Sequence, residues 1–192
     1  MKQADHRAVA AYFLGYDDPI FWRGPWHRGA FYIGNLLPDY NPFTYLRGVR
    51  QSHAMAGHNA SCRRNYVLRQ SERLGHKSFL SVWDFYILGT LLHYTADAFT
   101  WVHNGGEHCG MKVHRIYEKA LHSHFLKETG ILKESSIHPC AHGWEVYRAL
   151  WRESREDVGD VARDSQQILR ACRALFCGLL WARNFEKMKK RT

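Results

Sequence analysis

The sequence lacks an apolar run long enough to cross a membrane. Its longest such run, residues 79–92, is interrupted by Asp84 and is shorter than the ~20 residues that a spanning helix needs. The N-terminal stretch MKQADHRAVAAYF is charged and amphipathic and has no apolar signal core. We therefore expect no stable insertion into a membrane.

The sequence also lacks the cysteine pattern of a disulfide-stapled protein. It has five cysteines, an odd number, and no CxxC pair. Reduced thiols together with the missing signal core predict a cytoplasmic location.

Signals for β-structure are absent as well. No alternating apolar and polar pattern is long enough to build a sheet, and there is no internal repeat or low-complexity linker. A chain of 192 residues can bury the core of one domain. The sequence therefore predicts an all-α fold, a single-domain helical bundle over residues 1–185. The basic stretch EKMKKRT at 186–192 has no apolar anchor and is expected to be a disordered tail.

What is present is a series of helical patterns separated by Gly and Pro. Residues 16–29, rich in Gly, Pro and Trp, predict a loop. For residues 31–43 the pattern does not decide between strand and helix, but Pro38 and Pro42 predict a turn around Asp39. The expected helices span residues 4–14, 44–74 (broken near Gly57), 78–103, 111–128, 141–155 and 157–185.

The helix expected at 78–103 is apolar on nearly all faces, which is typical of a helix at the centre of a bundle. Asn104-Gly105-Gly106 predicts its C-terminal end. This helix nevertheless carries His93, Asp97 and His103. Because a buried carboxylate is costly unless it is paired or coordinated, Asp97 requires a partner.

Two pairs of a histidine and a carboxylate, four residues apart, occur on successive expected helices. They are His93 with Asp97 and His114 with Glu118, and this spacing puts both members of a pair on one helix face. Either pair alone is explained by a hydrogen-bonded core histidine or a surface ion pair. Together, with His103 between them, they favour a metal site, and imidazole with carboxylate suits zinc.

Four segments resemble, in order, the ligand set of the zinc-dependent phospholipase C family, whose fold the fungal single-strand-specific zinc nucleases share. They are GNLLPD (34–39), SH (52–53), HYTADAFTWVH (93–103) and HRIYE (114–118). The resemblance covers roughly residues 4–125. It implies an α-helical bundle with three zinc ions in a cleft. It also implies hydrolysis of a phosphodiester by metal-activated water.

Carried over residue by residue, the resemblance implies one ion held by Asp39, His53, His93 and Asp97. Asp97 would bridge to a second ion, which His6 helps to hold, and His103, His114 and Glu118 would hold a third. Asp39 and Asp97 are the residues expected to take part in catalysis, and Asp39 could orient or deprotonate the attacking water. The implied metal ligands are His6, Asp39, His53, His93, Asp97, His103, His114 and Glu118.

The early part of this pattern leaves alternatives open. Secreted members of the family use the α-amino group of an N-terminal Trp as a ligand, whereas here Met1 lies five residues before His6. We therefore expect two or three zinc ions, and other divalent metals remain possible. His27 competes with His6 and His58 with His53; spacing favours His6 and His53.

The charge of the chain fits an anionic partner. Its formal net charge is +9, which favours phosphates, nucleic acid or an acidic membrane surface. The function predicted is a zinc-dependent phosphoesterase that acts on an anionic phosphoester, with phospholipid and nucleotide both possible. The alternatives are a non-catalytic metal-binding protein of the same fold or a single-strand nuclease, although no nucleic-acid-binding motif is present. The sequence does not indicate an oligomeric state.

Overall fold

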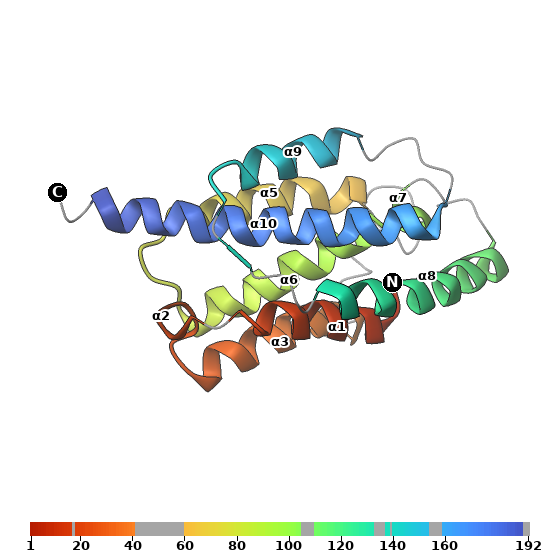
Figure 1. The fold of residues 1–192 in the computed structure, drawn as a ribbon, viewed down its shortest axis with the longest axis horizontal. Helices are drawn as coiled ribbons and strands as arrows, with labels where there is room; N and C mark the ends of the chain where they lie inside the picture. The colour runs from red at the N-terminus through yellow and green to blue at the C-terminus, as the bar shows by residue number, and fades with distance from the viewer. Residues whose placement is uncertain are drawn as a thin grey trace.

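The computed structural model describes residues 1–16, 18–40, 60–104, 110–132, 137–138, 140–153 and 159–189 (Figure 1). Within these ranges every regular element is helical and no strand occurs, so the prediction of an all-α fold is confirmed. The helices are α1 (Gln3–Leu14), α2 (Pro19–Trp22), α3 (Pro25–Tyr40), α5 (Ala60–Gly75), α6 (Val82–Ala98), α7 (Trp101–Asn104), α8 (Met111–Leu132), α9 (Gly143–Glu153) and α10 (Val161–Lys189).

Helix α6 is the centre of the bundle. It begins with a capping box, in which the Ser81 hydroxyl accepts from the Asp84 amide and the Asp84 carboxylate accepts from the Ser81 amide. Nearly all of its residues from Asp84 to Ala98 are buried. Helices α1, α3, α5 and α10 all pack on it, and Figure 1 shows it lying between α3 and α1 on one side and α5 and α10 on the other.

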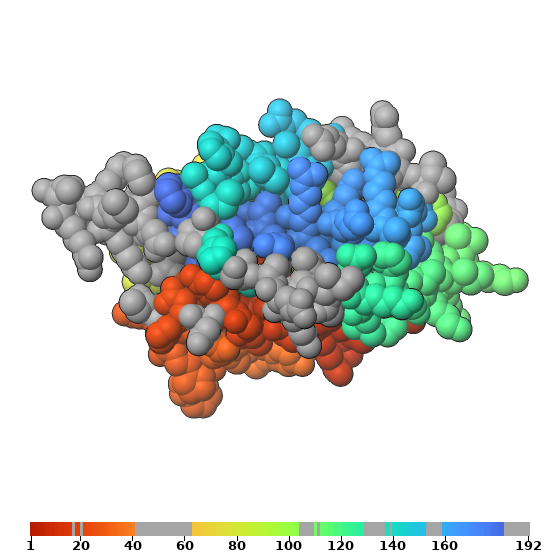
Figure 2. Space-filling model, viewed as in Figure 1, coloured from red at the N-terminus to blue at the C-terminus, as the bar shows by residue number. Residues whose placement is uncertain are grey.

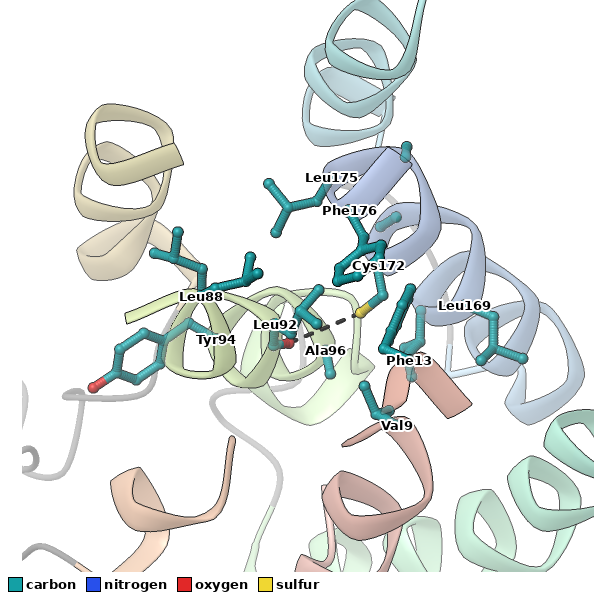
Figure 3. Packing of buried hydrophobic residues seen from close by; sticks show 14 of the residues in the cluster. Val9, Phe13, Leu88, Leu92, Tyr94, Ala96, Leu169, Cys172, Leu175 and Phe176 are labelled. Carbon is teal, nitrogen blue, oxygen red and sulfur yellow. Dashed lines mark hydrogen bonds between the residues drawn. The ribbon is translucent and has the colours of Figure 1, made fainter. Parts of the chain in front are cut away.

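The apolar core fills the space between α1, α6 and α10. Figure 3 shows Val9 and Phe13 of α1 meeting Leu92 of α6 and Phe176 of α10. The rings of Phe13 and Phe176 are 4.7 Å apart. Burying side chains of this size stabilises the fold by roughly 1.5–3 kcal/mol each, and this packing holds α1 against the central helix.

Glycines bring the backbones of α3 and α6 into direct contact. A Cβ atom on Gly34 would lie 2.0 Å from the Tyr86 carbonyl oxygen, and one on Gly89 would lie 2.1 Å from that of Phe31. The Thr90 hydroxyl adds a hydrogen bond of 3.2 Å to the Gly34 carbonyl oxygen. This close approach fixes the register of the two helices, and it places the C-terminal end of α3 beside the C-terminal half of α6.

Helix α8 forms one end of the molecule, and α10 runs along the visible face between α9 and the pair α1 and α3 (Figure 2). α8 packs on α1 and α10. An ion pair of 2.5 Å between His122 Nδ1 and the buried Asp5 carboxylate joins α8 to α1. The middle of α8 therefore lies against the start of α1.

The prediction of a loop at residues 16–29 is wrong for much of that range, because α2 occupies residues 19–22 and α3 begins at Pro25. Pro19 and Pro25 each stand at the first position of a helix, where a proline is well tolerated. The turn between them uses positive φ angles at Arg23 (55°) and Gly24 (134°). The undecided segment 31–43 is helical up to Tyr40, so the turn predicted around Asp39 is wrong, and Pro38 lies inside α3.

The single helix predicted at 78–103 is divided in two, α6 and α7. The Trp101 amide donates a hydrogen bond of 3.1 Å to the Asp164 carboxylate of α10 instead of continuing the helix. Other boundaries differ at the ends: α8 passes through Gly130 to Leu132, and α10 includes residues 186–189 of the expected disordered tail. Of the helix predicted at 44–74, residues 44–59 lie outside the described residues. None of the helices described here could span a membrane.

Candidate metal centre

The structure brings seven of the eight predicted ligand residues together in two groups. In each group, one ligand atom per residue lies within 4.8 Å of the others. His53 lies outside the described residues, as does its competitor His58. His27 belongs to neither group; its ring packs against Phe85 at 5.1 Å. The inner group is His6, Asp39, His93 and Asp97, and the outer group is His103, His114 and Glu118.

Asp97 lies at the middle of the inner group. Its Oδ1 is 3.3 Å from His6 Nε2 and its Oδ2 is 3.2 Å from His93 Nε2. His93 Nε2 is also 3.5 Å from Asp39 Oδ1. The two imidazole rings stack at 3.9 Å. His6, His93 and Asp97 are at most 2 % exposed, whereas Asp39 is 22 % exposed, so Asp39 is the member of the group that reaches solvent.

These separations fit the ligands of a common zinc ion. Ligand atoms at ~2.0–2.1 Å from a tetrahedral zinc are roughly 3.3 Å from one another, and the contacts around Asp97 and His93 measure 3.2–3.5 Å. Two imidazole nitrogens with carboxylate oxygens are also a donor set that zinc prefers. The residues present therefore fit a zinc ion.

The inner group holds its members in the protonation states that bind metal. Burial lowers the pKa of His6, and the neighbouring His93 lowers it further, so that it falls to about 3 despite the attraction of Asp97. Burial raises the pKa of Asp97, but the Met1 amine and the surrounding histidines outweigh burial and hold it well below its usual range. A neutral imidazole and an ionised carboxylate are the forms that coordinate zinc.

A backbone contact orients His93. Its Nδ1 donates a hydrogen bond of 2.9 Å to the carbonyl oxygen of Asn35, which leaves the lone pair on Nε2 facing Asp39 and Asp97. Histidines that bind metals usually have their second ring nitrogen fixed in this way. The interface between α3 and α6 therefore sets both the position and the tautomer of this ring.

The outer group lies nearer the surface. Glu118 Oε1 is 3.2 Å from His114 Nε2 and 3.9 Å from His103 Nε2. The side chains of His103, His114 and Glu118 are 21, 26 and 18 % exposed. The break between α6 and α7 turns His103 towards α8, which carries the other two residues.

The α-amino group of Met1 lies between the two groups, where the sequence did not predict it. It is 3.0 Å from Asp97 Oδ1, 3.2 Å from His103 Nε2 and 3.4 Å from Glu118 Oε1. Burial lowers the pKa of this amine, but Asp97 and Glu118 outweigh burial and raise it. The available signal in the sequence was the resemblance itself, because secreted members of the family use an N-terminal α-amino group as a ligand.

The fold and the two groups define a class of protein, an all-α bundle in which histidines and carboxylates gather near the C-terminal end of the central helix in an arrangement that could hold metal ions. Residues 21–176 match the model of one family, described as zinc dependent phospholipase C. The chain belongs to this family. The matched range contains Asp39, His93, Asp97 and the whole outer group, and His6 precedes it. Neither the curated proteins nor the solved structures searched contain a match to the chain.

Proposed function

We propose that this protein is a zinc-dependent phosphoesterase that hydrolyses a phosphodiester in the manner of a phospholipase C. Membership of the family supports a metal-dependent phosphoesterase in general. The observation that carries the proposal is the pair of ligand groups, one buried and one open to solvent, joined by the contacts of a single amine. Zinc bound there would supply Lewis acidity for charge on phosphate oxygens and would lower the pKa of a water.

The inner group would hold metal and position a water. Asp97 contacts ligand atoms of both histidines with separate oxygens and would hold metal together with them. Asp39 is the most exposed member of the group, so its carboxylate can reach a water at the opening and orient or deprotonate it. His6 and His93 would serve as neutral nitrogen ligands.

The outer group would bind metal at the side where a substrate phosphate arrives, because its three side chains are partly exposed. We propose the Met1 amine as a further ligand between the groups, which requires this amine to be free and deprotonated. Two or three ions remain the expected number.

A phospholipid is the substrate that the family name implies, and a net charge of +9 would assist the approach of any anionic phosphoester. Cleavage of nucleic acid and metal binding without turnover are the competing outcomes, and hydrolysis assays separate them. The cytoplasmic location stays a prediction.

The first test is elemental analysis of protein purified without added metal, followed by hydrolysis of bis(p-nitrophenyl) phosphate and of phosphatidylcholine vesicles. We expect at least two equivalents of zinc and turnover that a chelator abolishes. Asp97→Asn should lose both zinc and activity, whereas Glu72→Gln, an exposed carboxylate on α5, should lose neither. A protein that contains no zinc and takes up none on titration would refute the proposal.

A further inference from the structure

Asn35 of α3 is a buried polar residue whose side chain is unpaired within the described part of the chain. It is 0 % exposed, and neither its carboxamide oxygen nor its nitrogen has a partner among the described residues. Such groups are rare in native proteins because each loses its bonds to water without replacement. An apolar side chain would suit this position better if stability alone mattered.

The position of Asn35 along α3 points to the metal centre. It lies one turn after Phe31 and one turn before Asp39, so the three share one face of the helix. Phe31 belongs to the apolar core near Phe176, at 6.4 Å between rings, and Asp39 contacts His93. Asn35 therefore stands at the boundary between the core and the inner ligand group.

The backbone of Asn35 is held firmly at this boundary. Its carbonyl oxygen accepts the hydrogen bond from His93 Nδ1, and a Cβ atom on Gly89 would lie only 2.8 Å from its amide nitrogen. The side chain can rotate about its own bonds, but the residue cannot move away from the site.

His6 has a buried ring nitrogen that could donate a hydrogen bond to the carboxamide oxygen of Asn35. Its Nε2 faces Asp97 at 3.3 Å, and its Nδ1 is buried without a partner among the described residues. A histidine that binds metal through one nitrogen usually donates the N–H of the other to an oxygen acceptor. His93 has such an acceptor in the Asn35 carbonyl oxygen, and His6 has none among the residues that the structure describes.

The packing of α1 against α3 brings these two unmatched groups to neighbouring levels of the bundle. On α1, Phe13 meets the core at Phe176, and two turns earlier His6 stacks on His93 at 3.9 Å. On α3, the core contact is Phe31 and the contact with His93 is Asp39. Asn35 thus lies between these two levels, on the core side of the His93 ring on which His6 stacks.

We propose that Asn35 is a positioning residue for the inner metal site, whose side-chain carbonyl oxygen accepts a hydrogen bond from His6 Nδ1 when zinc is bound. This bond fixes the His6 tautomer with the Nε2 lone pair facing the ion. The unpaired carboxamide destabilises the metal-free protein. The hydrogen bond that it gains when zinc binds increases the affinity for zinc. The inference rests on the zinc site proposed above.

The test compares zinc affinity with the stability of the metal-free protein in variants of Asn35. Asn35→Leu keeps the branched shape and removes the acceptor. We expect it to raise the unfolding temperature in chelator and to weaken the tightest zinc site by about 10- to 100-fold. Asn35→Asp keeps an acceptor of the same shape, so it should retain zinc affinity while unfolding at a lower temperature in chelator. Asn35→Ala supplies the same comparison if leucine does not fit.

Ser71 provides the matched control. It is also 0 % exposed and its hydroxyl has no partner among the described residues, but it lies on α5, outside both ligand groups. Ser71→Ala should stabilise the metal-free protein and leave zinc affinity unchanged. In zinc-loaded wild-type protein labelled with 15N-histidine, a slowly exchanging Nδ1–H of His6 should be visible, and Asn35→Leu should make it exchange faster.

Each result has one meaning. Wild-type protein that binds no zinc refutes the proposed metal site itself. Wild-type protein that binds zinc, with equal affinity in Asn35→Leu and Asn35→Ala, refutes the role of Asn35 and leaves the metal site standing. Loss of affinity in Asn35→Asp equal to that in Asn35→Leu also refutes the hydrogen bond, because the acceptor is then irrelevant.

Discussion

Replacing Gly89 by alanine should weaken zinc binding without touching any ligand. The new Cβ atom would lie 2.1 Å from the Phe31 carbonyl oxygen and 2.8 Å from the Asn35 nitrogen, whereas ordinary contact begins at 3.4 Å. Both neighbours are helix backbone and cannot turn aside. Helices α3 and α6 must therefore separate by about 1 Å at this point to relieve the overlap.

Moving the two helices apart changes both the stability of the chain and its affinity for zinc. Overpacking of this kind costs about 1–3 kcal/mol, and the better helix propensity of alanine returns up to about 1 kcal/mol, so the net destabilisation is at most about 3 kcal/mol. The second effect is on the metal. His93 is tied across the same interface by its 2.9 Å bond to Asn35, and zinc ligands tolerate displacements of only about 0.2 Å. We expect zinc affinity to fall by about 10- to 100-fold, the range seen when a ligand loses its orientation.

Competition with a fluorescent chelator measures the zinc affinity, and thermal unfolding in EDTA measures the stability of the metal-free chain. The matched control is Gly29→Ala, on the same helix α3, where nothing lies within 4 Å of the new Cβ atom. It should be as stable as the wild type or slightly more so, with the same zinc affinity. If Gly89→Ala has the wild-type unfolding temperature in EDTA and the wild-type zinc affinity, the contact between α3 and α6 does not position the site.

Three further predictions concern the ligand groups. An N-terminal extension of a few residues converts the Met1 amine into an amide and should lower the zinc content by up to one equivalent, measured by mass spectrometry of the metal; unchanged content would exclude this amine as a ligand. Glu118→Gln should remove zinc from the outer group alone, leaving the tightest site at its wild-type affinity in a chelator titration; loss of all zinc would show that the groups do not load separately. The third prediction concerns pH. Because the pKa of His6 is about 3 in the folded protein and about 6.5 when unfolded, the unfolded chain binds the extra proton between these values. The free energy of unfolding in chelator should therefore decrease as the pH falls below about 6.5, by up to about 1.4 kcal/mol per pH unit. Urea titrations at pH 7 and pH 5 should show a smaller decrease for His6→Gln, and an equal decrease would contradict the assignment.

The parts of the site that depend on one helix could be predicted from the sequence. A spacing of four residues places His93 beside Asp97 and His114 beside Glu118 in any α-helix, whatever the rest of the chain does. An apolar surround on every face likewise required α6 to be central. The order of the motifs, compared with the family pattern, then identified Asp39 and His6 as ligands, although they belong to other helices.

The remaining features depend on contacts between distant parts of the chain. Met1 reaches the site because α1 packs along α6, so its amine meets a carboxylate 96 residues away. The division between α6 and α7 depends on Asp164, which lies 63 residues after the amide that it accepts from. The start of α3 at Pro25 was missed for a local reason, because a proline ends one helix and begins another with equal ease.

The unequal burial of the two groups has a consequence for the kinetics of metal exchange. An ion held by His6, His93 and Asp97 is enclosed by side chains at most 2 % exposed, and its way out is the opening beside Asp39, which must widen by local unfolding before the ion can leave. An ion held by the outer group meets solvent directly. A chelator should therefore take the outer ion at a rate proportional to its own concentration. It should take the inner ion at a rate that reaches a plateau, which equals the rate of local unfolding.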